Sequence, residues 1–164
     1  MRGAWCWVVA LVAIDVMAAQ TLDTVVVTGT RTERLSRESP VRTEVVSRDD
    51  IEVIHARDLK EALQYVPGLQ LREIHGKSGS EVWMQGLNAD RVLILVDGMP
   101  VSPTTGSSVD VTQLSLLDVE RVEVVKGATS ALYGSAAMGG VVNIITRRIS
   151  RGVELQGVID GGTY

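Results

Sequence analysis

Few side chains in this sequence have the types and spacing that catalysis or metal binding needs. The candidates are two histidines, one cysteine and two acidic pairs: His55, His75, Cys6, Asp49 with Asp50, and Glu120 with Glu123. No histidine or cysteine lies close in sequence to either acidic pair, so neither pair completes a hydrolytic or metal site. We therefore predict no catalytic residue, no metal site and no bound cofactor.

Two further segments suggest chemistry and have simpler explanations. Residues Lys126 to Ser130 (KGATS) contain the residue types of a phosphate-binding loop, but that motif places glycine before lysine and follows it with a helix. His75 could bind a haem iron through a neutral imidazole, although a solvated loop histidine is the simpler interpretation. His55 lies near an expected helix end, as a dipole partner or a surface residue. We predict that the chain is not an enzyme.

The N-terminus has the pattern of a secretory signal peptide, which we place at residues 1–19. Arg2 supplies the positive charge, Ala4 to Ile14 is an apolar run too short to span a bilayer, and Ala18 and Ala19 suit cleavage. A buried apolar helix is the alternative. The predicted cleavage also removes Cys6, which leaves no disulfide framework. The net charge of −4 argues against nucleic acid as a partner.

About 145 residues then remain, enough for one domain with its own core. Apolar alternation predicts strands, and a capping pattern of Ser47 and Asp50 begins a helical stretch that Pro67 and Gly68 end. The expected strands are 41–46, 69–73, 81–84, 91–96, 119–126 and 141–146, with a short helix at 111–117. The predicted fold class is α+β, with a small mixed β-sheet and short helices, over residues 40–148.

The segments on either side of this domain have different patterns. Residues 20–39 begin with a β-branched run and continue as a polar stretch, which predicts a flexible tether carrying an extended peptide. The alternative is that Val25 to Val27 form the first strand of the domain. In residues 149–164, Val153, Leu155 and Ile159 alternate with polar residues, as at the start of a first barrel strand whose barrel would follow.

Four motifs occur in order along the chain: DTVVVT at Asp23 to Thr28, VPG at Val66 to Gly68, VLILVDGMPV at Val92 to Val101, and a last block of VERVEVVKG, SALYG and GGVVNIIT between Val119 and Thr146. Together they resemble the plug domain of TonB-dependent outer-membrane receptors. The resemblance runs from Asp23 to about Arg148, nearly the whole mature chain, and the last block is its most specific part.

This resemblance implies the gate of a receptor that takes up a scarce nutrient such as an iron-siderophore, haem or cobalamin. The expected partners are the C-terminal domain of TonB in the periplasm, a barrel of about 22 strands around the plug, and the small-molecule cargo. The expected location is the outer membrane, or the periplasm if the chain is expressed alone. The resemblance makes one hexapeptide the TonB box: Asp23, Thr24, Val25, Val26, Val27 and Thr28.

Two polar loops correspond to the family's apical loops that contact cargo. Their candidate residues are His75, Lys77, Ser78, Ser80, Thr104, Thr105, Ser107, Ser108 and Asp110. Turn chemistry alone also explains glycine, serine, proline and aspartate at these positions, so ordinary solvated turns remain the alternative.

The sequence departs from the family pattern at two positions. Family members carry arginines that latch the plug to acidic residues of the barrel wall, whereas this chain has Gln85 and Lys126 there. Glutamine is uncharged, and lysine lacks the planar fork that binds a carboxylate twice. We therefore expect a latch that is weaker or shifted to other contacts. The competing functions are a stand-alone periplasmic binding or signalling module and the remnant of a truncated receptor gene.

Overall fold

A five-stranded mixed sheet forms the centre of the protein in the computed structural model, which describes residues 25–30, 34–35, 41, 43–76, 78–103, 106–127 and 130–148. Its order is β3 (Thr43–Ser47), β8 (Val119–Lys126), β9 (Gly140–Thr146), β6 (Val92–Val96) and β7 (Met99–Pro100). The β6–β9 pair is parallel and the other three pairs are antiparallel. The predicted α+β class with a mixed sheet is confirmed.

Local sequence signals explain the two helices that follow β3. Helix α1 (Arg48–Val53) begins with the predicted capping box, in which Ser47 accepts from the Asp50 N–H and the Asp50 carboxylate accepts from the Ser47 N–H. Helix α2 (Leu59–Leu63) is capped by the side chain of Asp58. The chain turns after α2 at Gly68, whose φ of +79° suits glycine.

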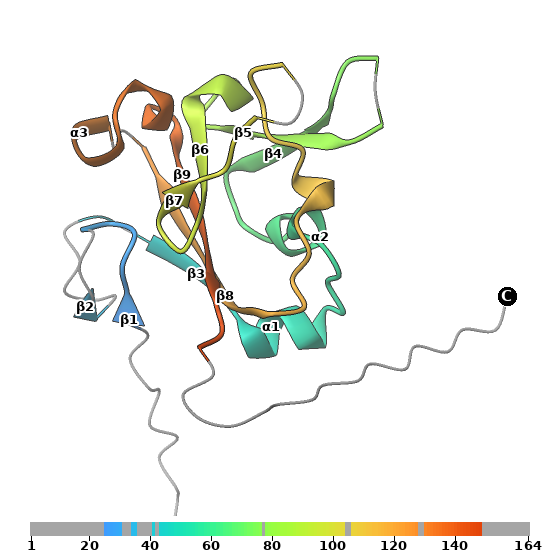
Figure 1. Ribbon diagram of the computed structural model, residues 1–164, viewed down its shortest axis with the longest axis vertical. Coiled ribbons are helices and arrows are strands. Elements are labelled where there is room, and N and C mark those ends of the chain that lie inside the picture. Colours follow the sequence, from blue (N-terminus) through green and yellow to red (C-terminus); the bar gives the residue numbers. More distant parts are fainter. Residues whose placement is uncertain are drawn as a thin grey trace, which may run out of the picture.

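The main core lies between one face of the sheet and the elements that cover it. These elements are α1, α2, the hairpin of β4 (Leu69–Glu73) and β5 (Ser80–Met84), and the 3-10 turn η3 (Val111–Gln113), all drawn on one side of the sheet in Figure 1. Val122 and Val124 of β8 and Val142 of β9 are fully buried on this face, against Leu59 and Leu63 of α2. The alternation of strand side chains explains why every second residue joins this core.

The opposite face has a smaller core and a different cover. Leu95, Val125 and Val141 pack there with Ala137, which lies in the 3-10 turn η4 (Ser135–Ala137). Helix α3 (Ser130–Tyr133) and the short pair β1 (Val25–Val26) and β2 (Arg34–Leu35) lie on this side (Figure 1). The N-terminal segment therefore packs on the domain.

The structure differs from the sequence-based prediction in its shortest elements. The expected helix at 111–117 is a 3-10 turn over three residues, and α3, η4 and the turn η2 (Ala89–Arg91) were not predicted. Elements this short complete no amphipathic period, so their sequences lack the pattern that reveals longer helices. The predicted signal peptide and first barrel strand lie outside the described residues.

Candidate functional site

The N-terminal segment is held by a buried carboxylate in the middle of the sheet. Glu123 of β8 is fully buried, and its Oε2 accepts hydrogen bonds from the Val27 N–H at 2.9 Å, the Thr28 N–H at 2.8 Å and the Thr28 hydroxyl at 2.6 Å. Its Oε1 accepts from Arg121 Nε at 3.0 Å. A buried charge is costly unless it is paired and hydrogen-bonded, so Glu123 needs both Arg121 and the segment.

Thr28 is the residue of this segment with the most partners. Its side chain is fully buried, its Oγ1 accepts from Asn143 Nδ2 at 3.0 Å, and its carbonyl accepts from the Tyr133 hydroxyl at 3.0 Å. Asn143 lies directly opposite Glu123 in the β8–β9 register. Thr28 is therefore fixed by β8, β9 and α3 together, which are three elements from the C-terminal part of the chain.

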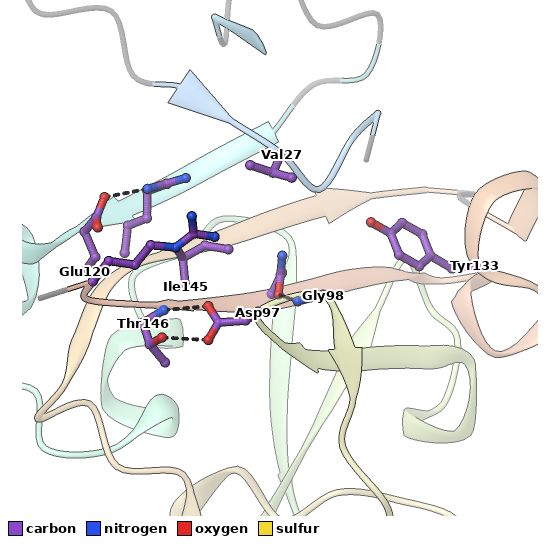
Figure 2. Close-up of a pocket in the computed structure, with 10 residues that line it drawn as sticks. Val27, Asp97, Gly98, Glu120, Tyr133, Ile145 and Thr146 are labelled. Carbon is purple, nitrogen blue, oxygen red and sulfur yellow. Dashed lines mark hydrogen bonds and ion pairs between the residues drawn. The ribbon is translucent and has the colours of Figure 1, made fainter. Parts of the chain in front are cut away.

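A polar cavity of about 540 Å³ opens beside this segment. Figure 2 shows Val27 on one side, Asp97, Gly98 and Thr146 on the other, and Tyr133 at one end. The Asp97 carboxylate accepts from the Thr146 N–H at 2.9 Å and from the Thr146 hydroxyl at 2.6 Å, drawn as dashed lines in Figure 2. The cavity thus lies between the N-terminal segment and the turn that joins β6 to β7.

These contacts differ from the expectation that residues 20–39 form a free tether. Val26 is 1% exposed and pairs with Arg34, and residues 27 and 28 bind Glu123. The physical reason is that the buried Glu123 Oε2 accepts from the N–H groups of residues 27 and 28 and from the Thr28 hydroxyl. Of the predicted TonB box, Val25 to Thr28 are placed in this way, and Asp23 and Thr24 lie outside the described residues.

The two polar loops predicted to contact cargo are joined by Asp110. This residue is 3% exposed, and its Oδ1 accepts from the Ser80 N–H at 3.0 Å, the Thr112 N–H at 3.0 Å and the Thr112 hydroxyl at 2.7 Å. Its Oδ2 accepts from Gln113 Nε2 at 3.0 Å. Burial raises the pKa of Asp110, but hydrogen bonds from Thr112, Ser80 and Gln113 outweigh this, so its pKa lies below the ordinary value.

The remaining loop candidates divide by exposure. His75, Ser78 and Ser107 are exposed, whereas Ser80 and Ser108 are buried like Asp110. A buried side chain is not available at the surface of this loop cluster, and the Ser80 N–H instead joins the two loops through its bond to Asp110. Lys77, Thr104 and Thr105 lie outside the described residues.

The two latch candidates lie at the ends of strands β5 and β8, which belong to different sheets. Gln85 follows β5, is exposed and has a φ of +55°. Lys126 ends β8, is half-buried, and its Nζ lies 3.4 Å from Glu44 Oε1 of β3. Lys126 thus already has an acidic partner within the domain.

The described part of the chain contains no group of three or more acidic, histidine or cysteine side chains placed to hold a metal ion. Nor, within those residues, is any helix both long and apolar enough to cross a membrane.

Sequence reasoning did not identify Asn143 and Tyr133 as functional residues, and it considered Glu123 only as half of an acidic pair. Glu123 faces the solvent in any simple model of an alternating strand, because Val122 and Val124 beside it face the core. The available signal in the sequence was the mostly apolar run at residues 140–146, which is typical of a central strand covered on both faces.

Comparison with known proteins decides the family. The family model described as TonB-dependent Receptor Plug Domain matches residues 36–141. The chain belongs to this plug-domain family. The vitamin B12 transporter BtuB of Vibrio cholerae serotype O1 is 39% identical to this plug domain over 134 residues, which cover 81% of the chain and 22% of that protein. BtuB of Vibrio vulnificus is 41% identical over 128 residues, which cover 77% of the chain and 21% of that protein.

Solved receptors share the fold of this plug domain. The alcaligin outer membrane receptor FauA from Bordetella pertussis matches with a TM-score of 0.66 and 24% identity, over 78% of this chain and 22% of that one. The siderophore receptor PiuA from Acinetobacter baumannii matches with a TM-score of 0.59 and 28% identity, over 70% and 15%. The plug domain spans about a fifth of the curated relatives it matches. Those relatives are transporters and receptors rather than enzymes or stand-alone modules.

Proposed function

We propose that this chain is the gate of an outer-membrane receptor that imports a corrinoid by energised transport. The observation that carries the proposal is the family match together with relatives at 39% and 41% identity that are vitamin B12 transporters. The same family supports a barrel around the plug, an outer-membrane location and a non-enzymatic role.

The predicted TonB box supplies the energy-coupling handle. A short β-branched peptide binds a partner by adding a strand to the edge of its sheet, with the main chain providing the hydrogen bonds. Residues 25 and 26 already form a strand with residues 34 and 35, which supports this mode of binding. In transport, the C-terminal domain of TonB takes the place of β2 as the partner strand.

Two loop regions, around residues 73–80 and 102–110, contact the cargo. They lie at the end of the domain away from the TonB box. The exposed side chains of His75, Ser78 and Ser107 are the contact candidates among the described residues. Gln85 and Lys126 contribute a latch to the barrel wall, and the ion pair of Lys126 with Glu44 supports a weaker latch at that position.

The test is uptake of radiolabelled cyanocobalamin by cells that express the complete receptor, with and without functional TonB. We expect TonB-dependent uptake of cyanocobalamin and none of a ferric siderophore. Uptake of the siderophore alone would refute the corrinoid assignment, and uptake that does not depend on TonB would refute the transport mechanism.

The handle is tested by Val26→Pro, which removes a backbone donor, against Val26→Ala, which keeps that donor while it shortens the buried side chain. We expect Val26→Pro to abolish uptake and crosslinking to TonB while cargo binding persists, and Val26→Ala to retain both. If the two variants lose cargo binding equally and retain crosslinking, residues 25–26 are only a structural strand.

A further inference from the structure

The β6–β7 turn contains an Asp–Gly pair, a dipeptide that isomerises readily because glycine has no side chain to hinder attack by its nitrogen. Asp97 and Gly98 form a two-residue loop between the paired residues Val96 and Met99, with φ of +50° and +80°. These are the features of a type I′ hairpin turn. Both loop residues are exposed and line the polar cavity in Figure 2, so water reaches this turn.

Isomerisation begins with attack of the Gly98 nitrogen on the side chain of Asp97. The Asp97 carboxyl takes a proton from solvent, the nitrogen bonds to its Cγ, and one carboxyl oxygen leaves as water together with the amide hydrogen. The product is a five-membered imide. A second water then adds to the main-chain carbonyl carbon of Asp97 and breaks the bond from this carbon to nitrogen. The main chain now runs through Cγ as isoaspartate, and the mass of the protein is unchanged.

Four hydrogen bonds to strand β9 hold the two reacting groups in place. The Asp97 carboxylate accepts from the Thr146 N–H at 2.9 Å and from the Thr146 hydroxyl at 2.6 Å. The Gly98 N–H donates to Asn143 Oδ1 at 3.1 Å. The Asp97 N–H donates to the Ile144 carbonyl at 2.9 Å. All four partners come from one short stretch of β9, so the turn loses these restraints together when it separates from that strand.

The conformation of the turn also opposes ring closure. A type I′ turn has ψ of about +30° at its first central residue, which places the Gly98 nitrogen nearly opposite the Asp97 Cβ across the Cα–C bond. A five-membered ring needs these two atoms on the same side of that bond. Ring closure therefore requires the turn to rotate out of its hairpin geometry, and this rotation pulls Gly98 away from Asn143.

We propose that Asp97–Gly98 is a modification site that stays unreactive while the turn is bound to β9 and isomerises, with water as the only co-reactant, when the turn separates from it. The modified turn cannot return to its place. Isoaspartate adds one carbon to the main chain of a two-residue loop and moves the carboxylate away from Thr146. Isoaspartate at position 97 therefore accumulates in molecules whose β6–β7 turn has opened.

The experiment incubates the complete receptor at neutral pH and physiological temperature and follows isoaspartate at position 97 by chromatography and electron-transfer mass spectrometry. Trypsin releases the peptide of residues 92–121, in which Asp110 and Asp118 precede valine and serve as internal references. A synthetic peptide of residues 92–101 gives the rate without protection. We expect the receptor to convert at least about twentyfold more slowly than this peptide, because ring closure must first break two or more net hydrogen bonds.

Substitutions separate local protection by β9 from the stability of the whole domain. Thr146→Val removes the hydroxyl that donates to Asp97, and Thr146→Ser retains it. Ser47→Ala is the matched control, because it weakens the cap of α1 and leaves the turn intact. We expect Thr146→Val to isomerise at least about fivefold faster than the parent, which corresponds to the loss of one net hydrogen bond. Thr146→Ser and Ser47→Ala should stay within about twofold of the parent, because opening of the turn is local.

A parent that converts as fast as the free peptide would overturn the inference, and so would equal rates in Thr146→Val and the parent. Equal acceleration by Ser47→Ala and Thr146→Val would also overturn it, because the turn would then react only after the whole domain unfolds. If Thr146→Val does not assemble, Asn143→Ala frees the Gly98 N–H and gives the same comparison. Asp97→Glu cannot close a five-membered ring, so a signal that persists in this variant would refute the assignment to Asp97.

Discussion

Replacing Gly79 by alanine tests whether Asp110 holds the two polar loops, around residues 73–80 and 102–110, together. Gly79 has a φ of +142°, and an added Cβ would lie 2.7 Å from Asp110 Cγ and closer still to Asp110 Oδ2. The carboxylate cannot turn aside without loss, because it is buried and accepts from Ser80, Thr112 and Gln113. We expect Gly79→Ala to displace Asp110 and separate the loops.

The magnitude follows from the bonds that Asp110 loses. A hydrogen bond to a charged group contributes about 1.5 to 3 kcal/mol, so losing two costs about 3 kcal/mol or more. Gly76→Ala is the matched control. Gly76 lies in the same loop with a φ of +73° and no atom within 4 Å of the added Cβ, so it reports backbone strain alone. That strain costs about 1 to 2 kcal/mol.

The assay is denaturant unfolding of a chain that begins at Gln20, in which Trp83 is the only tryptophan. Trp83 lies on β5 of the hairpin that the affected loop closes, and the Arg72 guanidinium carbon lies 3.9 Å from its ring centroid, so its fluorescence reports on this hairpin. We expect Gly79→Ala to lose about 2 kcal/mol or more beyond Gly76→Ala. Equal losses in the two variants would show that Asp110 yields freely and that it does not hold the loops.

Three further perturbations test other parts of the structure. Ser47→Ala removes the capping box of α1 and should cost about 1 kcal/mol in the same unfolding assay, whereas Ser78→Ala in an exposed loop should cost almost nothing. Folding lowers the pKa of Asp110, so the stabilisation that its carboxylate gives the folded domain is complete above the unfolded pKa of about 3.9. This stabilisation is lost as the pH falls through the folded pKa. Asp110→Asn should therefore make the free energy of unfolding depend less on pH on the acid side. Gln85→Arg should tighten plug retention in the assembled receptor by about 1 to 2 kcal/mol and slow uptake, and unchanged plug release in denaturant would argue against a latch at this position.

Local signals in the sequence were enough to predict the larger elements. Strand β4 begins at Leu69 and ends at Glu73 as expected, because Gly68 ends the turn before it and the polar loop follows it. The capping box fixed the start of α1 in the same way. In each case the residues that determine where the strand or helix begins or ends lie within a few positions of that end, so a short stretch of sequence is enough to predict it.

The candidate site was less predictable because its contacts are long-range. Glu123 and Thr28 are 95 residues apart, and nothing close to either in sequence indicates that they meet. A charged residue in an alternating strand is most simply placed in solvent. The buried Glu123 is stabilised by Arg121 and by the N-terminal segment that lies over β8, and the second of these contacts depends on the whole fold.

The strand order also constrains how this domain can be made. Thr43 of β3 pairs with Val125 of β8, and Val92 of β6 pairs with Gly140 of β9, so β3 has no partner strand, and β6 has only the short β7, until the end of the domain is present. Domains dominated by such distant pairings fold slowly, because the chain loses the entropy of closing a long loop before the strand pairing stabilises it. The order of strands thus delays completion of the five-stranded sheet until the whole domain is available.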